Sequence, residues 1–275
     1  MHLADARIWP TGRRLGNNGH VPDTGLNDSM NSRKDLIMND TSQHAPVVTM
    51  ACAKGGVTRT TTAMQIAASL AKRGEKVVLL DADHTRGATD WAEYVYETSR
   101  LRKREDEERK LGAGHPHHCT GKRLAFEVVP VGRTDLKRDR IVEKYPGHWI
   151  IVDTPSRDAD TIDAAIGIAD VTIVPTSTGA SEIEQAIKTC RATKNAIVLL
   201  SRVKRNTISM REALDDLDNA GVARFEHVIT EKESIRGIFG TANTDAREYP
   251  AVTDELVRCV RQLERGNVQL QETDR

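Results

Sequence analysis

The chain has 275 residues and a mass of 30.4 kDa, and its 40 Lys and Arg residues balance its 40 Asp and Glu residues. This balance excludes a uniformly basic, histone-like protein and an acidic disordered chain, although it allows local basic patches. The four cysteines contain no CxxC pair, which excludes a zinc ribbon and a disulfide framework and favours a reducing compartment. No run approaches the ~18 apolar residues of a membrane-spanning helix, and the N-terminus lacks a secretory signal pattern, so we expect a soluble, cytoplasmic protein.

Residues 1–45 differ from the rest of the chain, because asparagine, glycine and scattered charges replace any sustained helical or strand periodicity. Such a segment buries too little apolar surface to offset the entropy lost on ordering, so we expect a disordered N-terminal extension. Met30, Met38 and Met50 leave open whether the natural start codon lies downstream of Met1.

From Pro46 onward, short apolar runs alternate with amphipathic stretches. The first run is predicted to be a buried strand, and an apolar stripe at i, i+3, i+4 and i+7 predicts a core-facing helix after it. The strands are predicted at 47–51, 77–80, 126–129, 149–152, 171–174 and 196–200, and the clearest helices at 60–73 and 252–263. This alternation predicts an α/β fold over 46–265, with a single doubly wound, mostly parallel sheet covered by helices on both faces and a polar tail at 266–275.

One region interrupts this alternation. Residues 100–110 are almost all charged, which predicts a long helix with a solvated face, and their internal acids favour ion pairing over nucleic-acid binding. Residues 112–122 are predicted to form a surface loop. Their His115, His117, His118 and Cys119 match no standard zinc spacing, so a solvated loop is expected rather than a metal site.

The strongest local signal is the segment 54–62, KGGVTRTTT, which lies between the first predicted strand and the first predicted helix. A glycine-rich turn that leads into a helix presents backbone N–H groups and the positive end of the helix dipole to phosphate. A hydroxyl in the first helical turn suits Mg²⁺, and a cation beside it suits the β- and γ-phosphates. As a standard P-loop the segment departs at Thr58, where Gly is expected, and at Arg59, where Lys is expected. A purely structural turn is the alternative for this segment taken alone.

Carboxylates end two of the predicted strands. Asp81 and Asp83 follow the second strand, and Asp153 follows the fourth. The carboxyl ends of parallel strands meet at the crevice where such sheets bind ligands, so one acid can hold Mg²⁺ through its water shell and another can orient an attacking water. A helix N-cap or a turn is the structural alternative for any single aspartate. Three strand ends that each carry the expected group favour a nucleotide site.

Together these motifs resemble the ParA/MinD-type partition ATPases, P-loop NTPases with a deviant Walker A motif. The family's KGGxGKTT loop corresponds to KGGVTRTT at 54–61, and its DADPQGSAxDW segment corresponds to DADHTRGATDW at 81–91. The Walker B motif corresponds to 149–155, and the family's ADxxxxP strand to 169–175. The resemblance covers residues 46–265 and is greatest to the small plasmid ParA proteins that lack an N-terminal helix-turn-helix domain.

The resemblance implies a role for each matching residue, with ATP and Mg²⁺ as cofactors. Lys54 matches the signature lysine that reaches the partner's phosphates in an ATP-sandwich dimer, and Arg59 takes the place of the usual P-loop lysine. The implied nucleotide-binding residues are Lys54, Gly55, Gly56, Val57, Thr58, Arg59, Thr60 and Thr61. The implied Mg²⁺ ligands are Thr60, Asp81 and Asp153. The implied catalytic residues are Lys54, Asp81 and Asp83, of which Asp83 matches the carboxylate associated with water activation.

The departures from the family pattern carry their own expectations. Arginine is a fork of donors that is longer and wider than lysine, so a shifted cation at Arg59 is expected to retain binding and slow hydrolysis. Thr58 adds a Cβ where glycine permits unusual backbone angles. Residues 84–86 read HTR in place of PQG in the segment that senses the γ-phosphate. Ser201 and Arg202 lie where the family often has an Asn-containing segment that contacts adenine.

Sibling families differ at diagnostic positions. A nitrogenase iron protein needs a cysteine soon after Walker B, a tail-anchor ATPase needs a CxxC pair, and a membrane-bound MinD relative needs bulky apolar anchors that 266–275 lacks, so no membrane partner is expected. The family binds DNA non-specifically through basic residues of the dimer surface, and ordinary solvation is the alternative for each candidate here. The candidates are Arg202, Lys204, Arg205, Arg236, Arg258, Arg261 and Arg265.

The resemblance therefore implies an ATP-dependent switch for plasmid or DNA partition. ATP closes a homodimer, the dimer binds non-specific DNA and is nucleoid-associated, and a ParB-like or centromere-binding adaptor stimulates slow hydrolysis. The alternative is a nucleotide-binding adaptor or regulator with little or no hydrolysis, because Arg59 replaces the P-loop lysine. The sequence leaves open the partner, the basic residues that touch DNA, and whether the cargo is a plasmid, a chromosome or a protein cluster.

Overall fold

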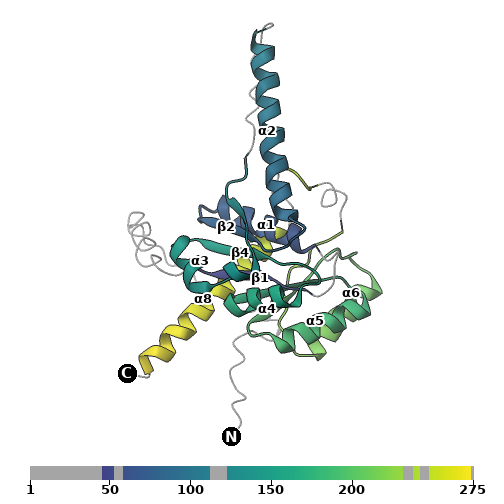
Figure 1. Cartoon of the computed structure of the whole chain (residues 1–275). Coiled ribbons are helices and arrows are strands. Elements are labelled where there is room, and N and C mark those ends of the chain that lie inside the picture. The colour runs from purple at the N-terminus through teal and green to yellow at the C-terminus, as the bar shows by residue number, and fades with distance from the viewer. Residues whose placement is uncertain (1–44, 53–57, 112–122, 232–237, 242–247, 274–275) are drawn as a thin grey trace, which may run out of the picture.

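A computed structural model describes residues 45–52, 58–111, 123–231, 238–241 and 248–273. Within these ranges, six strands form one sheet that is covered by helices (Figure 1). The strands are β1 (Val47–Met50), β2 (Val77–Asp81), β3 (Glu127–Pro130), β4 (Trp149–Asp153), β5 (Val171–Thr176) and β6 (Ala196–Leu200). The helices are α1 (Arg59–Lys72), α2 (Gly87–Leu111), η1 (Arg133–Asp135), α3 (Arg138–Lys144), α4 (Ala159–Ile168), α5 (Ala180–Ala192), α6 (Ile208–Asn219) and α8 (Tyr249–Thr273).

The sheet has the order β3-β2-β4-β1-β5-β6, and every neighbouring pair is parallel. Because parallel neighbours need a crossover, each strand is followed by a helical connection that returns over one face of the sheet. The predicted doubly wound α/β sheet is thus confirmed, and it is parallel throughout. The order places β4 between β2 and β1, so the strand ends that carry the predicted acids and the glycine-rich segment are adjacent.

Alternate residues of the strands enter two different cores. Val48 and Met50 of β1 lie in a core with α1, α2 and α8, whereas Val47 lies in a core with α3 and α4 on the other face. A third cluster packs α5 and α6 against β5 and β6. Strands that are buried on both faces read as continuous apolar runs, which explains why periodicity predicted them within a residue or two of their observed bounds.

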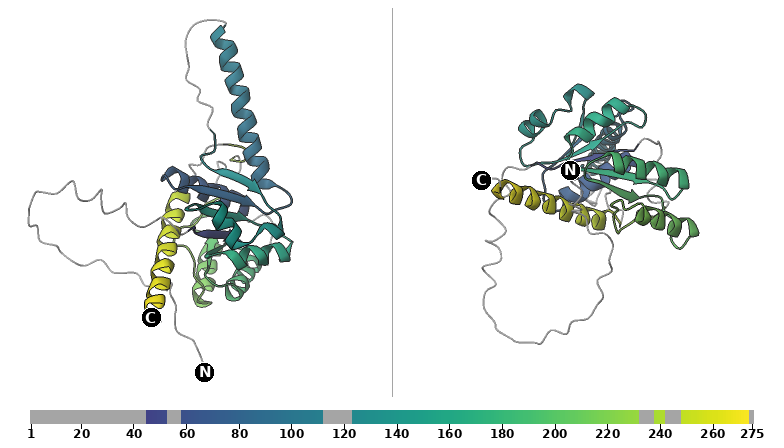
Figure 2. Two further views of the ribbon diagram at one scale, coloured as in Figure 1. Left: turned by 60° about the vertical axis from the view of Figure 1, so that its left-hand side comes forward. Right: turned by 90° about the horizontal axis from the view of Figure 1, so that it is seen from below.

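Two helices, α2 and α8, extend beyond the body of the domain. Figure 1 shows α2 rising well clear of the sheet, and both views of α8 show its C-terminal half leaving the body on another side (Figure 2). The charged run at 100–110 lies within α2, which confirms the helix predicted there. Helix α8 begins at Tyr249, before the predicted 252, and continues to Thr273 through most of the segment expected to be a polar tail.

No helix among the described residues is both long enough and apolar enough to cross a membrane. The predicted N-terminal extension at 1–44 and the loop at 112–122, with its His115–Cys119 cluster, lie outside the described residues.

Candidate functional site

Strand register brings the predicted acids into one row. Asp81 at the end of β2 pairs with Asp153 at the end of β4, and Asp153 pairs in turn with Met50 at the end of β1. The chain beyond Met50 leads to the glycine-rich segment, and α1 begins at Arg59. The parallel arrangement therefore assembles three segments that are distant in sequence at one edge of the sheet, which is the edge where α/β sheets bind ligands.

The backbone is left-handed at the residue that precedes α1. Thr58, the residue before the helix, has φ 63° and ψ 29°, in the left-handed region that favours glycine. The structure thus confirms that a glycine-type conformation is required where the sequence has threonine. Lys54, Gly55, Gly56 and Val57 lie outside the described residues, so their predicted roles stay predictions.

Arg59 does not project freely into the site. Its side chain is buried, and one terminal nitrogen, Nη1, donates to the backbone carbonyl of Cys52 at 3.0 Å and also to that of Pro155. Cys52 follows β1 and Pro155 follows β4, so the guanidinium links the segments that leave two neighbouring strands.

Asp153 is the most deeply buried acid of the site. Its relative exposure is 0%, and neither carboxylate oxygen has a hydrogen-bond partner of good geometry among the described residues. Burial raises the pKa of Asp153 to about 7, while the nearby Thr60 hydroxyl acts to lower it, the Asp81 charge to raise it and the Arg59 charge to lower it. A buried carboxylate without partners is costly, so this group is suited to a cation or to a donor brought by a ligand.

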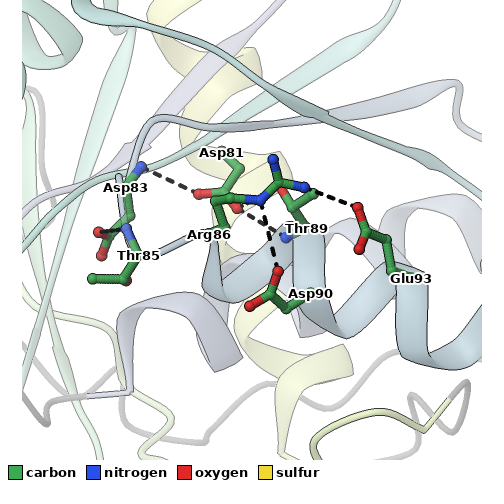
Figure 3. Close-up of polar contacts among 7 residues, drawn as sticks. All are labelled: Asp81, Asp83, Thr85, Arg86, Thr89, Asp90 and Glu93. Carbon is green, nitrogen blue, oxygen red and sulfur yellow. Dashed lines mark hydrogen bonds and ion pairs between the residues drawn. The ribbon is translucent and has the colours of Figure 1, made fainter.

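The Asp81 carboxylate is hydrogen-bonded to the start of α2. One oxygen accepts the Thr89 backbone N–H at 2.8 Å and the Thr89 hydroxyl at 2.7 Å, and the other accepts the Asp83 backbone N–H at 3.2 Å. Figure 3 shows these contacts converging on one carboxylate. The side chain therefore holds the turn between β2 and α2, the structural role that sequence reasoning weighs for a single aspartate. Its predicted roles toward metal and catalysis would be added to that one.

Asp83 faces a more open region. One of its oxygens accepts the Thr85 backbone N–H at 2.9 Å, and the residue lines a cavity of about 500 Å³ beside the ends of β2 and β3. The walls of this cavity also include Arg86, Arg133 and Asp158. Asp83 is thus placed where its carboxylate can meet water, as a water-orienting role requires.

The turn that replaces the family's PQG segment is held by ion pairs on α2. Arg86 adopts φ 57°, and its guanidinium lies 2.8 Å from Glu93 and 3.7 Å from Asp90 (Figure 3). The next residue, Gly87, lies close to α1, because a Cβ there would be 3.4 Å from Thr60 Cγ2 and 3.5 Å from Thr60 Oγ1. The first turn of α2 is therefore in contact with the predicted Mg²⁺ ligand Thr60.

The residues at this edge of the sheet fit Mg²⁺ and a nucleoside triphosphate. The unpartnered Asp153 oxygens beside the Thr60 hydroxyl form an oxygen donor set of the kind Mg²⁺ prefers, and α1 directs its N-terminus to the same edge. When bound, Mg²⁺ would neutralise phosphate charge. Thr60 and Asp153 are the described residues placed to hold it, directly or through water, with Asp81 as their neighbour.

Two features of the site had no local sequence signal. The phenol of Tyr249, the first residue of α8, is fully buried and lies 3.1 Å from the Thr62 hydroxyl, and Thr58 is a second hydrogen-bonding neighbour. The contact between Arg59 and the Pro155 carbonyl also had no signal in the sequence. Ser201 and Arg202, which the resemblance places at the adenine-contacting segment, follow β6, and β6 is two strands away from β1 in the sheet. Ser201 is buried and Arg202 has a φ of 55°.

Comparisons with known proteins agree with this geometry. Residues 48–239 match the family described as CobQ/CobB/MinD/ParA nucleotide binding domain. The chain is 29% identical over 239 residues to the Maintenance of carboxysome distribution protein A of Gloeobacter kilaueensis, a match that covers 80% of this chain and 98% of that protein.

Two solved structures share the fold. One is a variant of McdA from Cyanothece in complex with ATP, with a TM-score of 0.57, 16% identity and coverage of 78% of this chain and 97% of that one. Another is a plasmid partition protein from Borrelia burgdorferi, with a TM-score of 0.53, 19% identity and coverage of 78% and 99%. The family match spans more than half of the chain and agrees with the motifs and the parallel sheet. The chain therefore belongs to the CobQ/CobB/MinD/ParA nucleotide-binding family.

Proposed function

We propose that the protein is an ATP-binding switch that hydrolyses ATP slowly, dimerises in the ATP state and then binds DNA non-specifically to partition a cargo. A ParB-like or centromere-binding adaptor would stimulate hydrolysis and release the dimer, and DNA binding would keep the protein nucleoid-associated. The plasmid partition protein that shares the fold supports plasmid DNA as the cargo. The relative named for carboxysome distribution supports a protein body as the second class of cargo.

The observation that supports this proposal best is the state of Asp153. Neither oxygen of this fully buried carboxylate has a hydrogen-bond partner of good geometry among the described residues, which is costly unless the site gains a cation, and the Thr60 hydroxyl stands beside it at the start of a helix. Asp83 lies on the open side of the same row of strand ends, where a water-orienting group is needed.

The first experiment measures nucleotide binding and ATP hydrolysis by the full chain with Mg²⁺, with and without non-specific DNA. We expect tight Mg²⁺-dependent binding and slow turnover that DNA increases. If the protein binds ATP and shows no turnover under either condition, the adaptor function replaces the switch. If it neither binds nor hydrolyses ATP, nucleotide-dependent function of either kind is excluded.

Dimerisation is tested at the signature lysine. We expect Lys54→Ala to abolish the ATP-dependent increase in mass seen by light scattering, because this residue is the one that the family resemblance assigns to the partner's phosphates. The matched control is Lys76→Ala, which removes an exposed lysine before β2. A Lys54→Ala protein that still dimerises with ATP would contradict the role.

One observation favours the second candidate, a nucleotide-binding adaptor with little or no hydrolysis. The cation that replaces the P-loop lysine already donates to two backbone carbonyls, so part of its hydrogen-bonding capacity is committed before any phosphate arrives. Phosphoryl transfer depends on the placement of charge, so a committed cation slows the chemical step more than it weakens binding.

A further inference from the structure

Arg59 is the only arginine or lysine among the buried residues that the structure describes. A buried cation is stable only when its charge is compensated and its N–H groups have acceptors. The charge of Asp153 lies near enough for the two groups to influence each other, and the Cys52 and Pro155 carbonyls supply acceptors. The environment of Arg59 is thus built around this side chain.

The two carbonyls come from different parts of the site. Cys52 lies two residues beyond the end of β1 and Pro155 lies two residues beyond the end of β4, and these strands are neighbours in the sheet. One nitrogen of Arg59 therefore ties together the segment that enters the glycine-rich turn and the segment that follows the Walker B strand. Such a link restrains the entrance of the phosphate site when no nucleotide is present.

A guanidinium has five N–H donors on three nitrogens. Nη1 carries two of them, which matches its two carbonyl acceptors. Among the described residues, the other terminal nitrogen and Nε donate to no acceptor, so three donors remain available on the same planar group. A lysine has its three N–H donors on one atom, so it cannot hold two carbonyls and present a separate nitrogen to a ligand.

We propose that Arg59 is a two-ended positioning residue: Nη1 clamps the Cys52 and Pro155 carbonyls together, while the remaining guanidinium nitrogens donate to a phosphate oxygen of the nucleotide. This proposal rests on the proposed nucleotide binding for its second half only. It explains why the chain accommodates arginine where the family has lysine, because the larger group takes on a structural contact and still offers a charged donor to phosphate.

The test compares Arg59→Lys and Arg59→Ala with the matched control Arg73→Lys, which lies at the opposite end of α1 and whose partners are Pro250 and Asp254. Three readouts are measured on the full chain: Tm without nucleotide, backbone hydrogen exchange at 49–52 and 153–156 without nucleotide, and binding of AMPPNP with Mg²⁺. Hydrogen exchange reports the clamp directly and does not depend on turnover.

We expect Arg59→Lys to lower the nucleotide-free Tm by about 2–4 °C, to speed exchange in both segments, and to keep AMPPNP affinity within roughly tenfold of the wild type. Arg59→Ala should show the same loss of protection and also lose AMPPNP binding by more than tenfold, whereas Arg73→Lys should leave exchange and binding unchanged.

Unchanged Tm and exchange in Arg59→Lys would overturn the clamp, and wild-type AMPPNP affinity in Arg59→Ala would overturn the phosphate contact. A wild-type protein that binds no AMPPNP would overturn the proposed function and the second half of this inference. Lost protection in Arg59→Lys would, in that case, still establish the clamp.

Discussion

At the scale of single residues, the site combines groups that are costly to the folded protein when no ligand is bound. Asp153 is buried with no well-formed hydrogen bond among the described residues, Thr58 holds a left-handed backbone angle, and Arg59 is a buried cation. Each is a local departure from what a stable core requires, and such departures concentrate at functional sites. The cost of each can be measured separately.

The pH dependence of stability should report Asp153. Its pKa is about 7 in the folded protein and ~3.9 in an unfolded chain, so the folded state retains a proton that the unfolded state releases between these values. The contribution of this carboxyl to stability is therefore fully present below pH ~4 and is lost as the pH rises through 7. Asp153→Asn cannot ionise, and we expect it to be more stable than the wild type by roughly 2–4 kcal/mol at pH 8 and by less at pH 5.

The measurement is urea unfolding of nucleotide-free protein at both pH values, followed by Tm with Mg²⁺ and AMPPNP. The ligand should raise the Tm of the wild type and raise that of Asp153→Asn much less, because the amide cannot supply the negative charge. Asp163→Asn, which changes an exposed acid of α4, is the control and should change neither result. Parallel stability curves for wild type and Asp153→Asn would show that the buried carboxyl does not titrate as stated.

Thr58 and Tyr249 should be energetically coupled. A β-branched residue at φ 63° is strained by about 1–2 kcal/mol, and the buried Tyr249 hydroxyl offers a compensating contact to Thr58 as well as to Thr62. Burial raises the pKa of Tyr249 to about 12, so this phenol is a neutral hydrogen-bonding group at physiological pH. We expect Tyr249→Phe to cost about 1–2 kcal/mol in the wild type and less in a Thr58→Gly background.

A double-mutant cycle by urea unfolding measures this coupling. Tyr94→Phe, which removes an exposed hydroxyl from α2, serves as the control and should leave stability unchanged. Costs that add within ~0.3 kcal/mol would show that Thr58 and Tyr249 act independently.

At the scale of elements, the two halves of α2 differ in how closely they pack on the domain. Its first half is tied to the site and to the core, because Thr89 binds Asp81 while Ala88, Trp91 and Val95 are buried. Beyond Val95 the side chains described, up to Leu101, pack less closely: Ser99 is still buried, whereas Tyr96 and Leu101 are 52% and 59% exposed. The extension that rises from the body in Figure 1 is therefore not needed to complete the nucleotide edge of the sheet.

Removal of the extension should leave the domain intact. The Arg123 guanidinium lies 5.5 Å from the centre of the Tyr96 ring, so the chain returns beside α2 at this point and a short linker can replace 102–122. We expect the shortened protein to keep its Tm within about 2 °C and its ATP affinity within twofold. Trp91→Ala, within the packed half, should instead cost roughly 3–5 kcal/mol. A large loss of stability or of ATP affinity on shortening would mean that the extension supports the domain.

At the scale of the whole molecule, a chain with no net charge can still bind DNA through one basic face. Arg258, Arg261 and Arg265 are exposed, and their spacing places them on one side of α8, opposite the buried Leu256 and Val260. Figure 2 shows the C-terminal part of this helix leaving the body. We expect the side that carries these arginines to be the one that approaches a duplex. Arg236, another candidate from the sequence, lies outside the described residues.

DNA binding in the ATP state should weaken when these charges are removed. Changing Arg258, Arg261 and Arg265 together to Gln is expected to lower affinity for non-specific DNA at least tenfold and to reduce the slope of log K against log salt by about 2–3. The control removes the same number of exposed cations near α3, at Lys137, Arg140 and Lys144. Equal losses in both triple variants would place the DNA contact elsewhere.

The sequence alone predicted the fold class, which the structure confirms, and it predicted which strand ends form the candidate site. Continuous apolar runs separated by amphipathic stretches predict a covered parallel sheet because periodicity is carried within each segment. The glycine-rich turn and the aspartates that follow two strands predict a nucleotide site at one edge of the sheet. This prediction needs only the position of each strand end, which can be read within each segment. The motif also marked Thr58 as a position where glycine permits unusual backbone angles, and the structure gives it a φ of 63°.

Only the tertiary structure decided how these residues are used. The Arg59 contact with Pro155 joins residues 96 positions apart, and the Tyr249 contact with Thr62 joins residues 187 positions apart. Asp81, eight residues from Thr89, is bound to the start of α2, while Asp153, its neighbour in the sheet, has no partner among the described residues. Such differences depend on strand register and on the helices that pack over the strand ends, and no pattern within one segment contains the position of a partner that the fold brings from another.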